Sequence, residues 1–170
     1  MRPDLLNPLF AEVAGLKGVG PGLARPLDRL GLTRLRDVLY HLPDRFVSRR
    51  AVPDLDAASV GEQVVVALTP LEYRASMGRG PLRVMAADAA GNICALTFFG
   101  RNGGWAKKQL PLGETRWIAG RLDQYGQQLQ IVHPDHIAED SAALAGQLNE
   151  AVYPLVQGLT QGRVAALVAQ

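Results

Sequence analysis

The residue types best suited to binding chemistry gather in one stretch, 97–108, which reads Thr-Phe-Phe-Gly-Arg-Asn-Gly-Gly-Trp-Ala-Lys-Lys. Neighbouring side chains of a strand point to opposite faces, so Phe98 shares a predicted core face with Cys94 and Leu96. Phe99 points away from that face, and an exposed aromatic followed by a basic loop suits base stacking beside phosphate contacts. The same spacing is equally typical of a surface hairpin whose aromatics cap the edge of the core.

Positive charge is concentrated in the middle of the chain, although the formal net charge is only +2. Residues 74–121 carry eight basic side chains against two acidic ones. A polyanionic partner requires such localised charge, because each neutralised phosphate releases counterions, but a solvated surface of mixed charge has the same composition. From charge and strand parity, the candidates for phosphate contacts are Arg74, Arg79, Arg83, Arg101, Lys107, Lys108 and Arg121.

The composition is that of a soluble globular chain, with 48% apolar and 20% charged residues among 170. Cys94 is the one cysteine, so an internal disulfide is impossible, and its strand-like surroundings indicate a buried thiol in a reducing compartment. No apolar run approaches the roughly 18 residues of a membrane span, and the N-terminal residues lack the apolar segment of a signal peptide. We therefore expect a cytoplasmic protein without membrane contact.

Three short helices are predicted near the N-terminus, over 7–14, 21–30 and 33–42. The turn 16–21 between the first two reads Leu-Lys-Gly-Val-Gly-Pro and resembles the hairpin of the helix-hairpin-helix DNA-binding motif. Glycines in that hairpin let the backbone approach a phosphate, and the amides of the next helix point at it. Lys17, Gly18 and Gly20 are therefore a possible phosphate turn, although a turn that merely joins two packed helices has the same pattern.

Strand periodicity replaces helical periodicity after residue 53. Pro70 inside the first strand predicts a bulge or an edge, and an insert over 100–110 separates the third strand from the fourth. Five strands with such an insert are typical of the OB-fold, a small Greek-key barrel that commonly binds single strands. The predicted fold is mainly β with N-terminal helices, and its strands are 64–73, 82–87, 93–99, 115–122 and 128–133.

These patterns predict three segments: N-terminal helices over 1–52, an OB-fold domain over 53–138, and a linker with the start of a helix over 139–170. Thr160 caps that last helix, whose apolar face consists of Val164, Leu167 and Val168. No other segment looks long enough to cover this face. We therefore expect the helix to lack a packing partner in this chain and the natural polypeptide to continue.

The sequence contains no motif for binding a nucleotide or a metal ion. Gly-x-x-x-x-Gly-Lys-Ser/Thr is absent and no Gly-Lys pair occurs, so a P-loop cannot form. His41, His133 and His136 do not cluster with Cys94 at a metal-ligand spacing. His133 and His136 could share a face, but two histidines at a strand end are more often structural. We therefore predict no catalytic residue, no metal site and no cofactor in this chain.

Several motifs in a fixed order resemble the N-terminal wedge region of the RecG family of bacterial ATP-dependent DNA helicases. They span about 14–163, and together they are specific although no single one is. The motifs are Leu-Lys-Gly-Val-Gly-Pro at 16–21, Asp-Val-Leu-Tyr-His-Leu-Pro-Asp-Arg-Phe at 37–46, Thr-Phe-Phe-Gly at 97–100, the strand with Gly120, Tyr125-Gly126, Ile-Val-His-Pro at 131–134 and Val-Tyr-Pro at 152–154.

The resemblance implies roles for particular residues. The family's strand-end aromatic, which stacks on a base at a DNA junction, corresponds to Phe99. A second aromatic often follows four positions later, where this chain has Gly103. Trp105, two residues further on, either takes over this base-stacking role or packs under the loop.

The resemblance further implies recognition of branched DNA, a replication fork or Holliday junction, and of single-stranded DNA, in fork regression, recombination and DNA repair. ATP and Mg²⁺ are expected only for two helicase lobes that follow this region in the family, because this chain has no ATPase motif. The alternative is that the barrel mainly binds protein, either a single-strand-binding protein or the helicase's own motor lobes. We expect a monomer in the bacterial cytoplasm, associated with the nucleoid.

Overall fold

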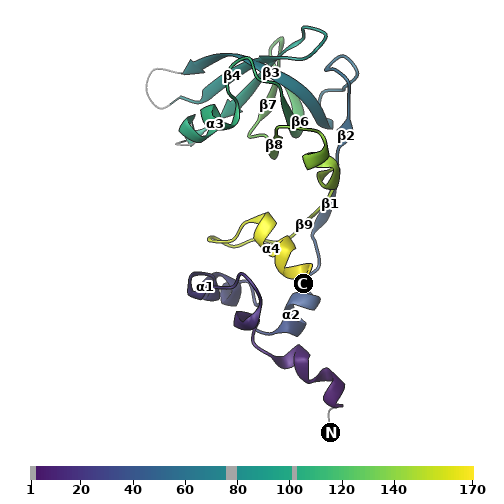
Figure 1. The fold of residues 1–170 in the computed structure, drawn as a ribbon, viewed down its shortest axis with the longest axis vertical. Coiled ribbons are helices and arrows are strands. Elements are labelled where there is room, and N and C mark those ends of the chain that lie inside the picture. Colours follow the sequence, from purple (N-terminus) through teal and green to yellow (C-terminus); the bar gives the residue numbers. More distant parts are fainter. Residues whose placement is uncertain (1–2, 76–79, 101–102) are drawn as a thin grey trace. The chain divides into compact units, whose positions relative to one another are not determined.

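The computed structural model describes residues 3–75, 80–100 and 103–170 (Figure 1). Contacts within the chain divide it into two units: the barrel unit, 47–150, and the helical unit, 1–46 together with 151–170. The C-terminal segment 151–170 thus belongs with the N-terminal helices, whereas the sequence suggested a separate linker over 139–170. Strands β1 (Arg45–Ser48) and β9 (Asn149–Val152) pair with each other in a two-stranded sheet.

Five strands of the barrel unit close a barrel in the order β3-β4-β5-β7-β6 and back to β3. Neighbouring strands are antiparallel except β5 and β7, which run parallel. This order, with helix α3 (Gly103–Gln109) between β5 and β6, confirms the predicted OB-fold (Figure 1). The strands are β3 (Gln63–Ala75), β4 (Leu82–Ala87), β5 (Ile93–Phe98), β6 (Arg116–Tyr125) and β7 (Gln128–Val132). The short β2 (Arg50–Ala51) pairs with β3, and β8 (His136–Ala138) pairs with β6.

Successive side chains of these strands point alternately into and out of the barrel, and the inward ones form its core. Val84, Leu96 and Ile131 face one another across β4, β5 and β7, and all three are fully buried. The neighbouring Arg83 points outward and is exposed. The register between β3 and β4 shifts after Pro70, so the predicted bulge is present.

Strand β6 approaches β7 so closely that it needs a glycine there. A Cβ atom placed on Gly120 would lie 2.6 Å from Cγ2 of Ile131 and 3.5 Å from the Cα atom of Pro134. Ile131 belongs to the buried core and is branched at Cβ, so it cannot swing aside. This contact gives the glycine of the β6 motif its physical reason.

The connection around residue 49 is less exposed than its polar sequence suggested. Arg49 is buried, and its guanidinium donates to the carboxylates of Asp135 at 2.8 Å and Glu150 at 2.9 Å and to the carbonyl of Gln147 at 2.8 Å. Burial raises the pKa of Glu150, but hydrogen bonds from His136 and Arg49 outweigh it and hold that pKa below its usual value. A buried charge of this kind is tolerated because it is fully paired. The short η4 helix (Ala142–Gln147) precedes β9.

The helical unit has its own core, and the C-terminal helix is part of it. Val164 and Leu167 of this helix are buried in one cluster with Leu27 and Val38, so the expectation that its apolar face lacks a partner is wrong. Several short elements together bury this apolar face, in place of a single long helix. They are η2 (Val13–Gly15), α1 (Pro21–Arg29) and α2 (Leu35–Leu39), which share the cluster with α4 (Gln161–Val168), whereas η1 (Asp4–Phe10) buries no residue.

Among the described residues, no helix is both long enough and apolar enough to cross a membrane.

Candidate nucleic-acid interface

The two phenylalanines at the end of β5 separate as their parity predicted. Phe98 is 2% exposed and packs in the barrel core, whereas Phe99 is 52% exposed. The buried Phe98 side chain fixes the end of β5 to the core, and the side chain of Phe99 extends outward from the barrel. Phe99 therefore has the position that a base-stacking side chain requires.

His133, which the sequence analysis treated as structural, lies beside Phe99. Its Nε2 accepts a hydrogen bond from the Phe99 amide at 3.2 Å, and the two ring centroids are 5.7 Å apart. The two residues are 34 positions apart in the sequence, and the parallel pairing of β5 with β7 brings them together. Parallel pairing of these two strands is part of the OB-fold topology. The predicted fold could therefore have indicated that His133 lies near Phe99.

Trp105 on α3 contacts the core phenylalanine instead. Its ring meets Phe98 edge-on, with centroids 6.4 Å apart, and 53% of Trp105 remains exposed. The Tyr73 hydroxyl donates to the α3-end carbonyls of Lys107 and Leu110, and the Lys107 ammonium lies 5.2 Å from the Tyr73 ring. Helix α3 is thus held against the barrel with one exposed aromatic, Trp105, and two predicted phosphate ligands, Lys107 and Lys108, on its surface.

Two of the predicted phosphate ligands form a row with the strand that carries Phe99. Arg74 on β3 pairs with Arg83 on β4, and Arg83 pairs with Thr97 on β5. Directly paired residues share a face of the sheet, and Phe99 continues the face of Thr97. Both arginines are exposed, and Arg74 also pairs with Glu72 at 2.9 Å. We call Phe99, His133, Arg83 and Arg74 the strand-end surface.

The other predicted phosphate ligands do not all join this surface. Arg121 pairs with Gln63 at the start of β3, eleven residues before Arg74, which is about 35 Å of extended strand. Lys108 lines a small cavity of about 110 Å³ with Arg116 and residues of the β8 region. Arg79 and Arg101 lie outside the described residues.

The turn 16–21 is held by the C-terminal residue. The side-chain amide of Gln170 accepts from the Lys17 amide and donates to the Lys17 carbonyl, both at 3.1 Å. Gly18 has a φ of 85°, which only glycine adopts easily. A cavity of about 360 Å³ lies at this turn, lined in part by Gly18, Gly20 and Arg163. The turn therefore combines backbone amides with two basic side chains and offers no aromatic ring.

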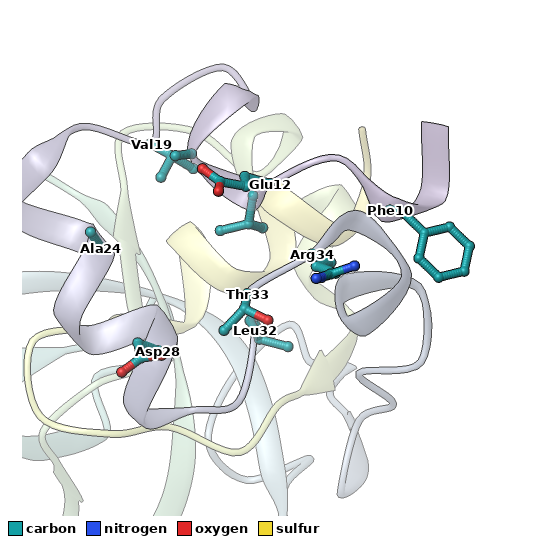
Figure 2. A pocket seen from close by; sticks show the side chains of 10 residues that line it. Phe10, Glu12, Val19, Ala24, Asp28, Leu32, Thr33 and Arg34 are labelled. Carbon is teal, nitrogen blue, oxygen red and sulfur yellow. The ribbon is translucent and has the colours of Figure 1, made fainter. Parts of the chain in front are cut away.

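A larger cavity of about 430 Å³ also lies in the helical unit (Figure 2). Apolar side chains such as Val19 and Leu32 line it together with the carboxylates of Glu12 and Asp28. Figure 2 shows the ring of Phe10 pointing away from the other labelled side chains. Arg34 also lines the cavity, so its charged lining consists of two carboxylates and one guanidinium.

Within residues 3–75, 80–100 and 103–170, no three His, Cys, Asp or Glu side chains converge as metal ligands. The buried thiol of Cys94 is also unsuited to metal binding or nucleophilic attack, because burial raises its pKa to about 12.

The closed five-stranded barrel places the chain in the class of OB-fold domains. The family model of the RecG wedge domain matches residues 12–170. The chain therefore belongs to the RecG wedge domain family, and the resemblance noted in its motifs is confirmed.

Two relatives show the extent of the match. The chain is 27% identical over 158 residues to the ATP-dependent DNA helicase RecG of Acidithiobacillus ferridurans, covering 91% of this chain and 23% of that protein. It is 26% identical over 175 residues to the RecG helicase of Haemophilus influenzae, covering 100% of this chain and 24% of that protein. The chain thus spans about a quarter of the length of these relatives.

A solved structure of RecG bound to a three-way DNA junction has the same fold. Its TM-score is 0.75 at 20% sequence identity, and the match covers 95% of this chain and 22% of that chain. Identity at this level supports the fold alone.

Proposed function

We propose that this chain binds branched DNA and acts as the strand-separating wedge of a DNA helicase. The observation that carries the proposal is the strand-end surface, where the exposed Phe99 follows two residues after Thr97, the strand partner of the exposed Arg83. An aromatic face can take a base that is unpaired at a branch point, and the arginine can hold a neighbouring phosphate. Duplex DNA without a branch offers no unpaired base to such a surface.

The proposal includes the setting of this binding event. The relatives are ATP-dependent DNA helicases about four times as long, and this chain has no P-loop. We infer that the ATP and Mg²⁺ chemistry belongs to motor lobes outside these 170 residues. Their pulling would drive the duplex against the wedge during fork regression, recombination and repair, on the chromosome in the cytoplasm. Single-stranded arms of the fork are the second ligand of the same surface.

A titration against a fork, a blunt duplex and a single strand tests the proposal, at two salt concentrations. We expect the fork to bind tightest and the affinity to fall steeply with salt, because phosphate contacts release counterions. Phe99→Ala should weaken fork binding by about 1–3 kcal/mol, the usual contribution of one stacked base. Equal affinity for fork and duplex, or a Phe99→Ala variant that binds the fork like the parent chain, would contradict the proposal.

A second candidate is a protein-binding module, and an exposed apolar stretch in the helical unit favours it. Leu39, Tyr40, Leu42 and Phe46 are each more than 60% exposed within eight residues. Scattered exposed apolar residues are ordinary, but four this close are typical of a protein contact. A single-strand-binding protein or the motor lobes would be the partner. Such an apolar interface should survive high salt, whereas DNA binding should not.

A further inference from the structure

His133 occupies an unusual position at the end of β7. Its φ of 48° makes it the one non-glycine residue with a positive φ among those that the structure describes. Its amide donates to the Thr97 carbonyl at 2.9 Å, which continues the β5–β7 pairing one residue past Val132. Non-glycine residues hold this conformation only where their surroundings enforce it, and such positions cluster at binding sites.

The two ring nitrogens of His133 have different hydrogen-bonding roles. Because Nε2 accepts the Phe99 amide hydrogen at 3.2 Å, the ring proton resides on Nδ1. Nδ1 makes no hydrogen bond to any described residue, and His133 is exposed. The side chain therefore keeps one free donor at the surface while its other nitrogen holds the backbone of Phe99.

The ring of His133, and not that of Trp105, accompanies Phe99. The planes of His133 and Phe99 are inclined by 40° with centroids 5.7 Å apart, so both rings border the same space. Both His133 and Trp105 meet the buried Phe98 edge-on, with centroids 6.3 Å and 6.4 Å away, but in the described part of the chain only His133 also contacts the Phe99 ring. Histidine is one of the side chains on which proteins stack unpaired bases.

We propose that His133 is the second DNA-contacting ring of the strand-end surface and the residue that positions Phe99. This inference rests on the proposed binding of branched DNA. Phe99 takes the face of the unpaired base, and His133 borders the same nucleotide and donates its Nδ1–H to an oxygen of it.

The test uses the full 170-residue chain and a synthetic fork with 2-aminopurine as the unpaired base at the branch. His133→Asn removes the ring, and asparagine tolerates a positive φ better than other side chains. We expect fork affinity to fall about fivefold, the lower end of the effect of one lost base contact, with weaker quenching of 2-aminopurine. The slope of log affinity against log salt should stay unchanged, because the contact neutralises no phosphate charge.

Two further variants make the result decisive. His133→Gly relieves the backbone conformation and also lacks the ring, so it should lose affinity to the same extent. Tyr125→Asn removes an exposed aromatic at the tip of the β6–β7 hairpin and should bind like the parent chain. Tryptophan fluorescence during unfolding checks that each barrel is folded, since Trp105 and Trp117 both lie in the barrel unit.

The outcomes separate this inference from the proposed function. If Phe99→Ala weakens fork binding while His133→Asn and His133→Gly bind like the parent chain, His133 has no role and the inference is overturned. If Phe99→Ala has no effect either, the proposed function itself fails. If His133→Asn loses affinity while His133→Gly retains it, the ring is unnecessary and the inference is again overturned.

Discussion

The strand-end surface and the turn 16–21 are both candidates for DNA contact, and they offer DNA different chemistry. The first presents an exposed aromatic, Phe99, next to exposed arginines. The second presents glycine amides with Lys17 and Arg163, and a Gln170 side chain that already occupies the Lys17 backbone groups. An aromatic can distinguish an unpaired base from a paired one, whereas amides and cations meet only the phosphates that every DNA shares.

Because of this difference, we expect the two regions to make separate contributions to DNA binding. The strand-end surface should decide which DNA structure is preferred. The turn should add affinity that is the same for all DNA and depends on salt. Because the two regions belong to different units of the chain, either can be weakened while the other is kept.

The largest effect is expected from Gly120→Ala, which attacks the scaffold of the strand-end surface. The new methyl group would press on Ile131 Cγ2, and overpacking of this severity costs about 3 kcal/mol. The free energy of unfolding measured by tryptophan fluorescence should fall by that amount, since both tryptophans lie in the barrel unit. Gly146→Ala in η4 of the same unit is a milder control, because its Cβ meets no atom within 4 Å and its φ is not positive. Equal losses for the two variants would show that the contact with Ile131 is unimportant.

Acid should weaken the same scaffold through Asp88, which caps the β4–β5 hairpin. Burial raises the pKa of Asp88, but hydrogen bonds from the Leu55 amide, from Asn92 and from the Ala90 amide outweigh it and hold that pKa below its usual value. A depressed pKa contributes stability above the unfolded value near 4, and this stability is lost as the pH falls through the folded value.

Asp88→Asn separates this effect from general acid sensitivity. The variant should be about 2 kcal/mol less stable at pH 7, because hydrogen bonds to a charged acceptor are lost. Its barrel should then lose less stability than the parent between pH 5 and pH 3, as followed by tryptophan fluorescence in urea. A variant whose pH dependence is as steep as that of the parent chain would assign the acid sensitivity to other carboxylates.

Arg83→Ala should sharpen the comparison on the barrel side. Arg83 pairs with Thr97, two residues before Phe99, so its loss should weaken fork binding by about 1 kcal/mol and reduce the salt slope by about one. Arg121→Ala removes the same charge on β6, opposite Gln63 at the start of β3, and is the matched control. Fork titrations at several salt concentrations measure both slopes. A larger effect from Arg121 than from Arg83 would move the DNA path to the other side of the barrel.

Lys17→Ala should have the smallest effect, below about 1 kcal/mol, and it should be equal for fork and duplex. A phosphate contact weakens binding uniformly and changes the salt slope by about one. Lys108→Ala serves as a control for the loss of one exposed positive charge away from the turn. If Lys17→Ala reduced the preference for fork over duplex, the turn would itself recognise the branch, and the expected separation of roles between the two regions would be wrong.

Local patterns were enough to predict much of the barrel. Strand parity depends only on neighbours in the sequence, so the strands 82–87 and 93–98 and the opposite orientations of Phe98 and Phe99 are confirmed. The bulge after Pro70 is equally local, because proline lacks the amide that the ladder needs. The roles of these residues in binding stay predictions.

Other features could not be predicted from local patterns. Leu39 and Leu42 follow helical spacing after Val38, but α2 ends at Leu39, and only Val38 of the three is buried. The apolar face of α4 is buried against several short segments that lie more than a hundred residues earlier in the sequence. Which segments share a core is a property of the folded chain, and no periodicity records it.

By itself, the sequence determined the chemistry at each position: the strand parity of Phe99, the basic residues near it, the glycines of the turn and the absence of a P-loop. The tertiary structure decided which of these meet. It placed His133 against Phe99, paired Arg49 with Asp135 and Glu150, and put Arg121 far from Arg74 along β3. The physical reason is that a side chain's type and local direction depend on its own backbone, whereas its neighbours depend on how distant strands pair and close.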